Sequence, residues 1–426
     1  MKDVMTPRLQ IPQFPPAARH GIFGRFFAAL LIPAVLALGA CATGGAPGVG
    51  PGLSTAGANN SAAAKSGGGG HGLPRIDVLV PVFDPGLPED SDEWEKRGIY
   101  PELRRAEATR FALKMKAALD KTGAFGSVRV APSAQATGEL YVNGKILESN
   151  GEDVRIEIAA TDISGRKWLG KKFSHRAKEA FHRDPRNKNR DAYDPVFEEA
   201  AEYIVKRLKK RDAEELAKLQ RIAAIRFGGS LSAETFARYL KTENGRTTLV
   251  AAPADDDPML QRIAPLRVRD QLFIDNMQSH YASFDGKLQE SYLVWQEQSL
   301  IEVKAARKAK LKATGQGILG GLLVAASVVA GADSDNSAAT EVATTIGTVA
   351  GAVVLAQSFQ TRSEMQAHRA ALAELGRSID IEVQPQVVAY EKETAELTGS
   401  AAEQHEQWIA FLKKIYELEA TPETEL

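Results

Sequence analysis

The sequence predicts an α+β protein with a small mixed or antiparallel sheet and packed helices, followed by a mainly helical region that carries an apolar helical hairpin. Three observations lead to this fold class. Strand-like alternation and helix-like spacing of apolar residues follow one another within 75–211. Residues 267–312 contain no proline and a single glycine, which favours long helix. Residues 313–360 hold two long runs without a charge.

The first forty residues have the pattern of a targeting segment. Lys2, Arg8, Arg19 and Arg25 precede or border an uncharged apolar run over 26–40. At about 15 residues, this run is shorter than the roughly 20 that a membrane-spanning helix needs. We therefore interpret the segment as a signal peptide.

Cys41 is the only cysteine of the chain, and it follows Leu38, Gly39 and Ala40. This tetrapeptide resembles the lipobox of bacterial lipoproteins. The resemblance implies cleavage before Cys41, a lipid on its sulfur and acylation of the new N-terminus, which together anchor a protein permanently. Because Ala42 is not the aspartate that retains such lipoproteins at the inner membrane, the resemblance implies the outer membrane, with the body in the periplasm. The alternative is a secretory signal with an incidental or buried cysteine.

Composition limits what the mature chain can bind. Beyond residue 40 it has 49 basic and 53 acidic residues, a net charge of −4, so charge gives no reason to expect a nucleic-acid partner. With Cys41 acylated, no disulfide can form within the chain. Residues 41–74 are rich in Gly, Ala and Ser, which is typical of a flexible tether.

Residues 75–211 predict the α+β domain. Apolar residues occupy both faces of 76–83, as in a central strand covered on both sides. A helix follows, with Pro101 in its first turn and Gly123 as its stop, and Asp194 begins a last helix as its N-cap. Between the helices we expect a short strand at 125–132 and antiparallel strands at 138–149, 154–165 and 167–173.

This order of elements, β-α-β-β-β-β-α after a lipoprotein tether, resembles the TolB-N-terminal-like fold of several outer-membrane lipoproteins. The segments IDVLVPVFD and ELRRAEATRFALKMKAAL carry the resemblance. Its members include the curli-export lipoprotein, activators of penicillin-binding synthases and exopolysaccharide-secretion lipoproteins. The resemblance implies a role in envelope assembly or export, although a fold by itself does not determine function.

Residues 212–312 are predicted to be mainly helical. Short helical runs end near Gly245, and a long amphipathic helix or helix pair covers 267–312. Five positive charges lie between Lys304 and Lys312. They suit either a solvated helix end favoured by the helix dipole or a contact with lipid head groups.

Residues 313–360 contain two uncharged runs whose helical length would match a bilayer core. Small residues recur at every fourth position, which lets paired helices approach closely. The spacing resembles the glycine-zipper hairpin of some outer-membrane lipoproteins. Three interpretations remain open: a membrane-inserted hairpin, a hairpin buried in protein and an oligomerisation hairpin. The glycines expected to pair the helices are Gly317, Gly321, Gly347 and Gly351.

Residues 361–426 are expected to form a β-hairpin around 391–393 and an amphipathic helix opened by Ser400. The apolar stripe of this helix suits core packing better than partner docking. It contains Trp408, Phe411, Leu412, Ile415 and Leu418.

No motif of a catalytic or metal site occurs in the chain. The densest polar stretch is 182–195, where His182, Asp184, Asp191 and Asp194 could serve as acid–base groups or metal ligands. Arginines and lysines lie between them, which favours a solvated loop with local ion pairs. We therefore expect no metal and no catalytic residue.

A second charged loop, 87–98, lacks the residue order of a calcium site. Trp94 within it and Tyr100 beside it are candidates for contact with a protein partner.

These features favour a non-enzymatic, lipid-anchored outer-membrane lipoprotein that acts in the periplasm as a scaffold or accessory in envelope assembly or export. Its partners would be membrane lipid and an envelope protein, with a homo-oligomer as an open option and nucleic acid excluded. No cofactor is expected apart from the lipid on Cys41. One alternative is an oligomeric pore or translocation component built on the glycine-rich hairpins. A second is an envelope hydrolase without a recognisable motif.

Overall fold

The computed structural model describes residues 73–96, 99–251, 253–254, 256–315, 367–368, 370–377, 380–390 and 392–420. Within them the chain has the predicted α+β class, with a mixed sheet, packed helices and a mainly helical continuation. The predicted signal peptide, nearly all of the tether and residues 316–360 of the predicted apolar hairpin lie outside the described residues. None of the helices in the described ranges is both long and apolar enough to cross a membrane.

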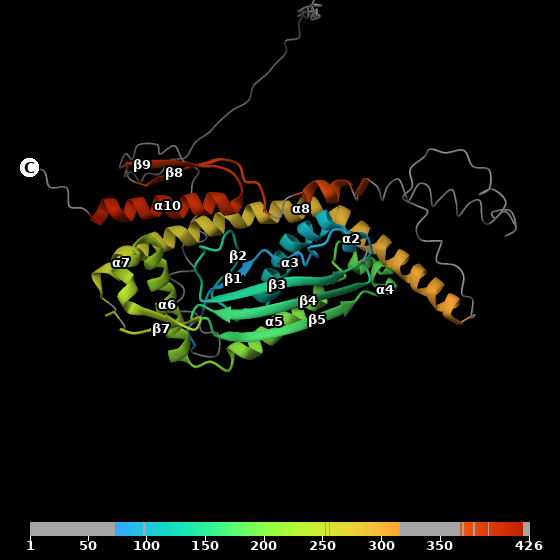
Figure 1. The fold of residues 1–426 in the computed structure, drawn as a ribbon, viewed down its shortest axis with the longest axis horizontal. Helices are drawn as coiled ribbons and strands as arrows, with labels where there is room; N and C mark the ends of the chain where they lie inside the picture. Colours follow the sequence, from blue (N-terminus) through green and yellow to red (C-terminus); the bar gives the residue numbers. More distant parts are fainter. Residues whose placement is uncertain are drawn as a thin grey trace, which may run out of the picture. The chain divides into compact units, whose positions relative to one another are not determined.

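Five strands form one mixed sheet in the order β2-β1-β3-β4-β5 (Figure 1). β1 is parallel to its neighbours β2 and β3, whereas β3, β4 and β5 are antiparallel. The predicted pairing of the last three strands is therefore confirmed. The strands are β1 (Val78–Pro81), β2 (Val128–Ala131), β3 (Leu140–Ser149), β4 (Asp153–Asp162) and β5 (Lys167–Arg176).

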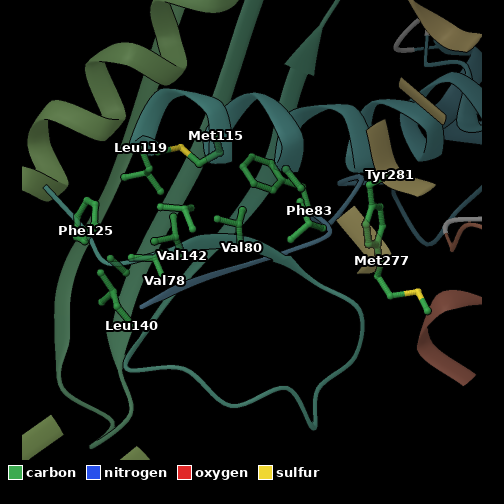
Figure 2. Close-up of a cluster of buried hydrophobic side chains, with 14 of the residues drawn as sticks. Val78, Val80, Phe83, Met115, Leu119, Phe125, Leu140, Val142, Met277 and Tyr281 are labelled. Carbon is green, nitrogen blue, oxygen red and sulfur yellow. The ribbon is translucent and has the colours of Figure 1, made fainter. Parts of the chain in front are cut away.

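Two helices, α3 (Pro101–Lys121) and α5 (Asp194–Leu208), pack on one face of the sheet. Figure 2 shows Val78 of β1 and Val142 of β3 beneath Met115 of α3. All three side chains are fully buried. Since successive strand residues point to opposite faces, this contact places the even-numbered residues of β1 on the α3 side.

The ends of these helices follow the sequence signals with one correction. Pro101 is the first residue of α3, and Gly123 follows its end with a φ of 63°. Asp194 is the first residue of α5 and not its N-cap; the N-cap is Tyr193, and the Asp194 carboxylate accepts a hydrogen bond from Lys114 at 2.9 Å. The remaining short helices of this domain are α2 (Asp92–Lys96), α4 (Glu179–Arg183) and the 3₁₀ turn η2 (Pro185–Asn187).

The segment after the domain contains a β-hairpin where the sequence predicts helix. Asn244 and Gly245, with φ of 50° and 72°, form the two-residue turn between β6 and β7. An Asn-Gly pair favours this turn because both positions need a positive φ. The elements are α6 (Ala213–Leu231), α7 (Ala233–Phe236), η3 (Ala237–Tyr239), β6 (Leu240–Glu243) and β7 (Arg246–Leu249).

A single helix, α8 (Pro258–Gly315), accounts for the predicted long helix or helix pair. It has 58 residues and includes Pro265 near its start. At a rise of 1.5 Å per residue it is about 87 Å long. Figure 1 shows α8 running beside α10 and then past the sheet.

α8 passes around the β2 edge of the sheet. Ile274 packs on Leu79 of β1, on the face opposite α3. One turn later, the Gln278 side chain bonds the backbone N–H and C=O of Val130 in β2, at 2.8 and 3.0 Å. Further along, Tyr292 reaches α3 on the first face. The prediction that the first strand is covered on both sides is thus confirmed.

The C-terminal elements are the predicted hairpin and helix, β8 (Gln386–Tyr390), β9 (Glu393–Leu397) and α10 (Ala401–Ala420). Ser400 opens α10: its Oγ accepts the Glu403 N–H at 3.3 Å, and the Glu403 carboxylate accepts the Ser400 N–H at 2.8 Å. Trp408 stacks on Phe273 of α8 with ring centroids 5.1 Å apart, so the apolar stripe serves core packing, although Leu418 at its end is exposed.

Candidate functional site

Most of the predicted functional residues lie outside the described part of the chain. These are the lipidation residue Cys41, its lipobox residues Leu38, Gly39 and Ala40, and the helix-pairing residues Gly317, Gly321, Gly347 and Gly351.

The two predicted partner-contact residues occupy different environments. Trp94 lies in α2 and is half-buried, and its indole N–H donates to the Pro88 carbonyl at 2.9 Å. That bond ties the ring to its own loop. Tyr100, directly before α3, is 49% exposed. Tyr100 therefore offers the larger accessible surface of the two.

The polar stretch 182–195 does not gather its acidic groups and histidine into one site. Asp184 pairs with Arg186 at 2.7 Å, and Asp194 bonds Lys114. Asp191 is buried and bonded to α3 and α8. Across the described ranges, no group of three His, Cys, Asp or Glu side chains could hold a metal ion.

Asp191 belongs to a buried polar cluster that joins α8 to the domain, here called the Arg110 cluster. The Arg110 guanidinium, on α3, donates to Asp191 at 2.9 and 3.1 Å, to Asp285 of α8 at 2.5 Å and to Gln289 of α8 at 2.8 Å. Its carbon lies 4.4 Å from the centroid of the Tyr292 ring. The Arg110 side chain is fully buried, yet its charge is balanced by two carboxylates.

The pKa values of two buried carboxyl groups in this region are shifted in opposite directions. Burial alone would raise the pKa of Asp191, but Arg110, Lys114 and hydrogen bonds outweigh it and hold that pKa below its usual range. Burial raises the pKa of Glu107, and the nearby Arg104 only partly opposes the rise. Glu107 accepts hydrogen bonds from Ser149 and from Tyr292 of α8. Two carboxyl groups therefore link α3 to α8: Asp191, whose pKa is lowered, and Glu107, whose pKa is raised.

A second polar group brings together a serine, a histidine and an aspartate. Ser133 Oγ lies 2.7 Å from His405 Nδ1, and His405 Nε2 lies 3.1 Å from Asp270 Oδ1. Ser133 follows β2, Asp270 is on α8 and His405 is on α10. In the tautomer that carries its proton on Nε2, His405 donates to Asp270 and its Nδ1 accepts from the Ser133 hydroxyl.

This arrangement can act either as a clamp or as a nucleophile with its base. His405 is fully buried, and Ser133 Oγ also accepts the Gln135 N–H at 3.2 Å, which suits a clamp between three segments. The two ring nitrogens are exchanged relative to the usual serine hydrolase, in which Nε2 faces the serine. The hydrogen-bond order from acid to base to hydroxyl is nevertheless that of an activated serine.

Ser133 lines a groove of about 500 Å³ at the carboxyl ends of β1 and β2. Its other walls come from β3 and from the segment that leads into α10. Asp380 contributes a carboxylate, but that group accepts the backbone N–H groups of Ile381 and Ala402. The remaining lining residues are Pro81, Val82, Ala131, Pro132, Ala134, Tyr141, Asn143 and Ala402.

The sequence offered no signal for either polar group. Ser133, Asp270 and His405 are separated by more than a hundred residues each, and none stands in a motif. Arg110 lies directly before Phe111 in α3, outside the apolar stripe at helical spacing, so its burial could not be predicted from the sequence.

No family model, no curated protein sequence and no solved structure matches the chain.

Proposed function

We propose that this chain is a lipid-anchored outer-membrane lipoprotein whose periplasmic body acts as a scaffold or accessory in envelope assembly or export. The signal peptide and Cys41 support the anchor, and the resemblance of the domain to TolB-N-terminal-like lipoproteins supports the envelope role. The observation that carries the scaffold role is the attachment of α8, which is bound to the α+β domain at widely separated points along its length.

The last attachment of α8 lies close to its end. Lys304 pairs with Glu179 at 3.1 Å, and Arg307 pairs with Glu152 and Asp153 at 2.9 and 3.1 Å. Only about two helical turns separate Arg307 from the end of α8. The uncharged sequence follows directly. This attachment close to the end of α8 supports a scaffold that presents residues 313–360 to a membrane or partner.

Fractionation of the cell envelope tests the anchor. Wild-type protein and the Cys41→Ala variant would be compared before and after a carbonate wash. We expect the wild type in the outer-membrane fraction and the variant released from it. Variant protein that resists the wash would show that residues 313–360 hold the membrane themselves, and wild-type protein in the soluble fraction would contradict the proposal.

The pore alternative rests on residues 313–360, most of which lie outside the described ranges. Its test is the size of the detergent-solubilised protein. Replacing Gly317, Gly321, Gly347 and Gly351 by leucine should prevent a ring of paired hairpins from assembling. A monomer in the wild type, or an oligomer unchanged in the variant, would remove that alternative.

A hydrolase is the second candidate, and the contact of Ser133 with His405 and Asp270 favours it. Labelling with a fluorophosphonate probe separates the two uses of this group. A clamp leaves the wild type unlabelled. An activated serine gives one label per chain at Ser133, which the Ser133→Ala variant loses.

A further inference from the structure

The two edges of the five-stranded sheet differ. At the β2 edge, Gln278 bonds both backbone groups of Val130, which closes that edge. β5 forms the other edge, and in the described ranges no backbone or side-chain group hydrogen-bonds to its outer side. Alternate residues of Lys167–Arg176 therefore present a row of unpaired N–H and C=O groups on the outer side of β5. Such a row is a template for a further strand.

β5 is also strongly basic. Its sequence, KWLGKKFSHR, has three lysines and one arginine and no acidic residue. Lys167 and Lys172 are exposed, and neither takes part in an ion pair within the described part of the chain. Arg176, in contrast, is paired with Asp153 at 2.6 Å. Because like charges would face each other, two copies of this edge would repel one another. The charge therefore selects against a second copy of the chain and for an acidic strand.

A groove of about 340 Å³ runs beside this edge, where β5 meets α5. Lys167 and Lys171 of β5 and Arg207 of α5 line it, together with the rings of Trp168 and Tyr203. Lys171 Nζ lies 3.4 Å from the centroid of the Tyr203 ring, which holds this ammonium group at the wall. A carboxylate in the groove would meet Lys167 and Arg207, and also Lys171, which lies 3.7 Å from Glu199 of α5. Charge-assisted hydrogen bonds favour such a ligand.

We propose that β5 binds an extended acidic segment of an envelope protein as a sixth strand. The open edge supplies main-chain hydrogen bonds, and the groove receives every second side chain, because strand side chains alternate between faces. Acidic residues at alternate positions are therefore the signature of the partner segment. The inference deepens the scaffold role proposed above by naming how the partner is held, but it does not require the lipid anchor.

Peptide binding to the full chain in detergent tests the charge requirement. The probe is a fluorescent eight-residue peptide of alternating Glu and Thr, and its counterpart alternates Lys and Thr. We expect only the acidic peptide to bind, and we expect Lys167→Glu with Arg207→Glu to weaken binding about tenfold or more, since each reversal turns attraction into repulsion. The matched control, Lys218→Glu with Lys287→Glu, reverses two exposed charges outside the groove and should bind like the wild type.

Two N-methylated peptides test the strand pairing. Each carries N-methyl groups on one alternate set of residues, and only the set that faces β5 should abolish binding. Amide exchange of residues 167–176 should slow when the unmethylated peptide binds. Binding that survives both methylations, tolerates the charge reversal in the groove or accepts the lysine peptide equally would overturn the proposal. The Cys41→Ala variant should bind the peptide as the wild type does. The binding test therefore stays valid even if the lipid anchor proposed above is absent.

Discussion

At the scale of single residues, Arg110 links the α+β domain to α8 through two ion pairs, one with the buried Asp191 and one with the partly exposed Asp285 of α8. Arg110 has no solvent to stabilise its charge, and its partners come from both 182–195 and α8. Removing one member of such a pair leaves an uncompensated buried charge, which costs about 3–5 kcal/mol. The ion pairs of Arg110 are therefore needed for α8 to dock on the α+β domain.

Because the pKa of Asp191 is lowered, the free energy of unfolding depends on pH in the acid range. Its folded pKa lies below the unfolded value of about 3.9, so its contribution is present above that value and is lost as pH falls through the folded pKa. We expect the urea midpoint of the wild type to fall between about pH 5 and pH 3. The Asp191→Asn variant should have a lower free energy of unfolding than the wild type at neutral pH. This difference in free energy should become smaller as the pH falls. A difference that stays constant over this range would contradict the assignment.

Gly144 shows what close packing demands of one position in β3. A β-carbon there would overlap the Phe83 ring, which is itself buried against Phe111 at 6.4 Å between centroids. We expect Gly144→Ala to lower the free energy of unfolding by about 1–3 kcal/mol, because the core must shift. Gly286→Ala is the matched control. Nothing lies near its β-carbon within α8, so it should leave stability unchanged or raise it by up to about 1 kcal/mol.

At the scale of elements, Gln278 substitutes for a missing strand beside β2. Its amide makes two bonds to Val130 across 148 residues of sequence. We expect Gln278→Ala to destabilise the protein by about 1–2 kcal/mol, since both backbone groups lose a partner. Hydrogen exchange at Val130 should speed up at the same time. Asn276→Ala, on the exposed side of the same helix, should change neither quantity.

Local patterns account for most elements of this fold, because each depends on neighbours in sequence. Alternation located the strands, and Pro101 and Gly123 bounded α3. Asn244 and Gly245 mark the turn of the β6–β7 hairpin, but the helix-like spacing of the flanking residues predicts helix there. The path of α8 around the sheet could not be predicted. It depends on contacts such as Gln278 with Val130, which no local pattern encodes.

The candidate site was beyond local patterns for the same reason. Ser133, Asp270 and His405 meet only because the loop after β2, α8 and α10 pack together. Of the two features of the β5 edge, only the run of basic residues could be predicted from the sequence. That β5 would be an edge strand depended on the order of strands in the sheet.

At the scale of the whole molecule, the predicted boundary at residue 211 separates the domain from helices that complete its core. Buried side chains of α6, α8 and α10 belong to one apolar cluster with those of the sheet. We expect the fragment 73–211 to lack cooperative urea unfolding, since Arg110 and the β2 edge lose their partners. Adding residues 213–315 in trans should restore a cooperative transition. A fragment 73–211 that unfolds as cooperatively as the full chain would show that the domain is autonomous.

The Arg110 cluster also has a kinetic consequence. During synthesis from the N-terminus, and during the export proposed above, Arg110 emerges first and Asp285 follows only 175 residues later. Until then the guanidinium has half of its carboxylate partners, and the α+β domain stays incomplete. Contacts between residues so distant in sequence slow folding, because a long loop must close before they form. Late completion of the domain would suit the export proposed above, because an unfolded chain can still be threaded across a membrane.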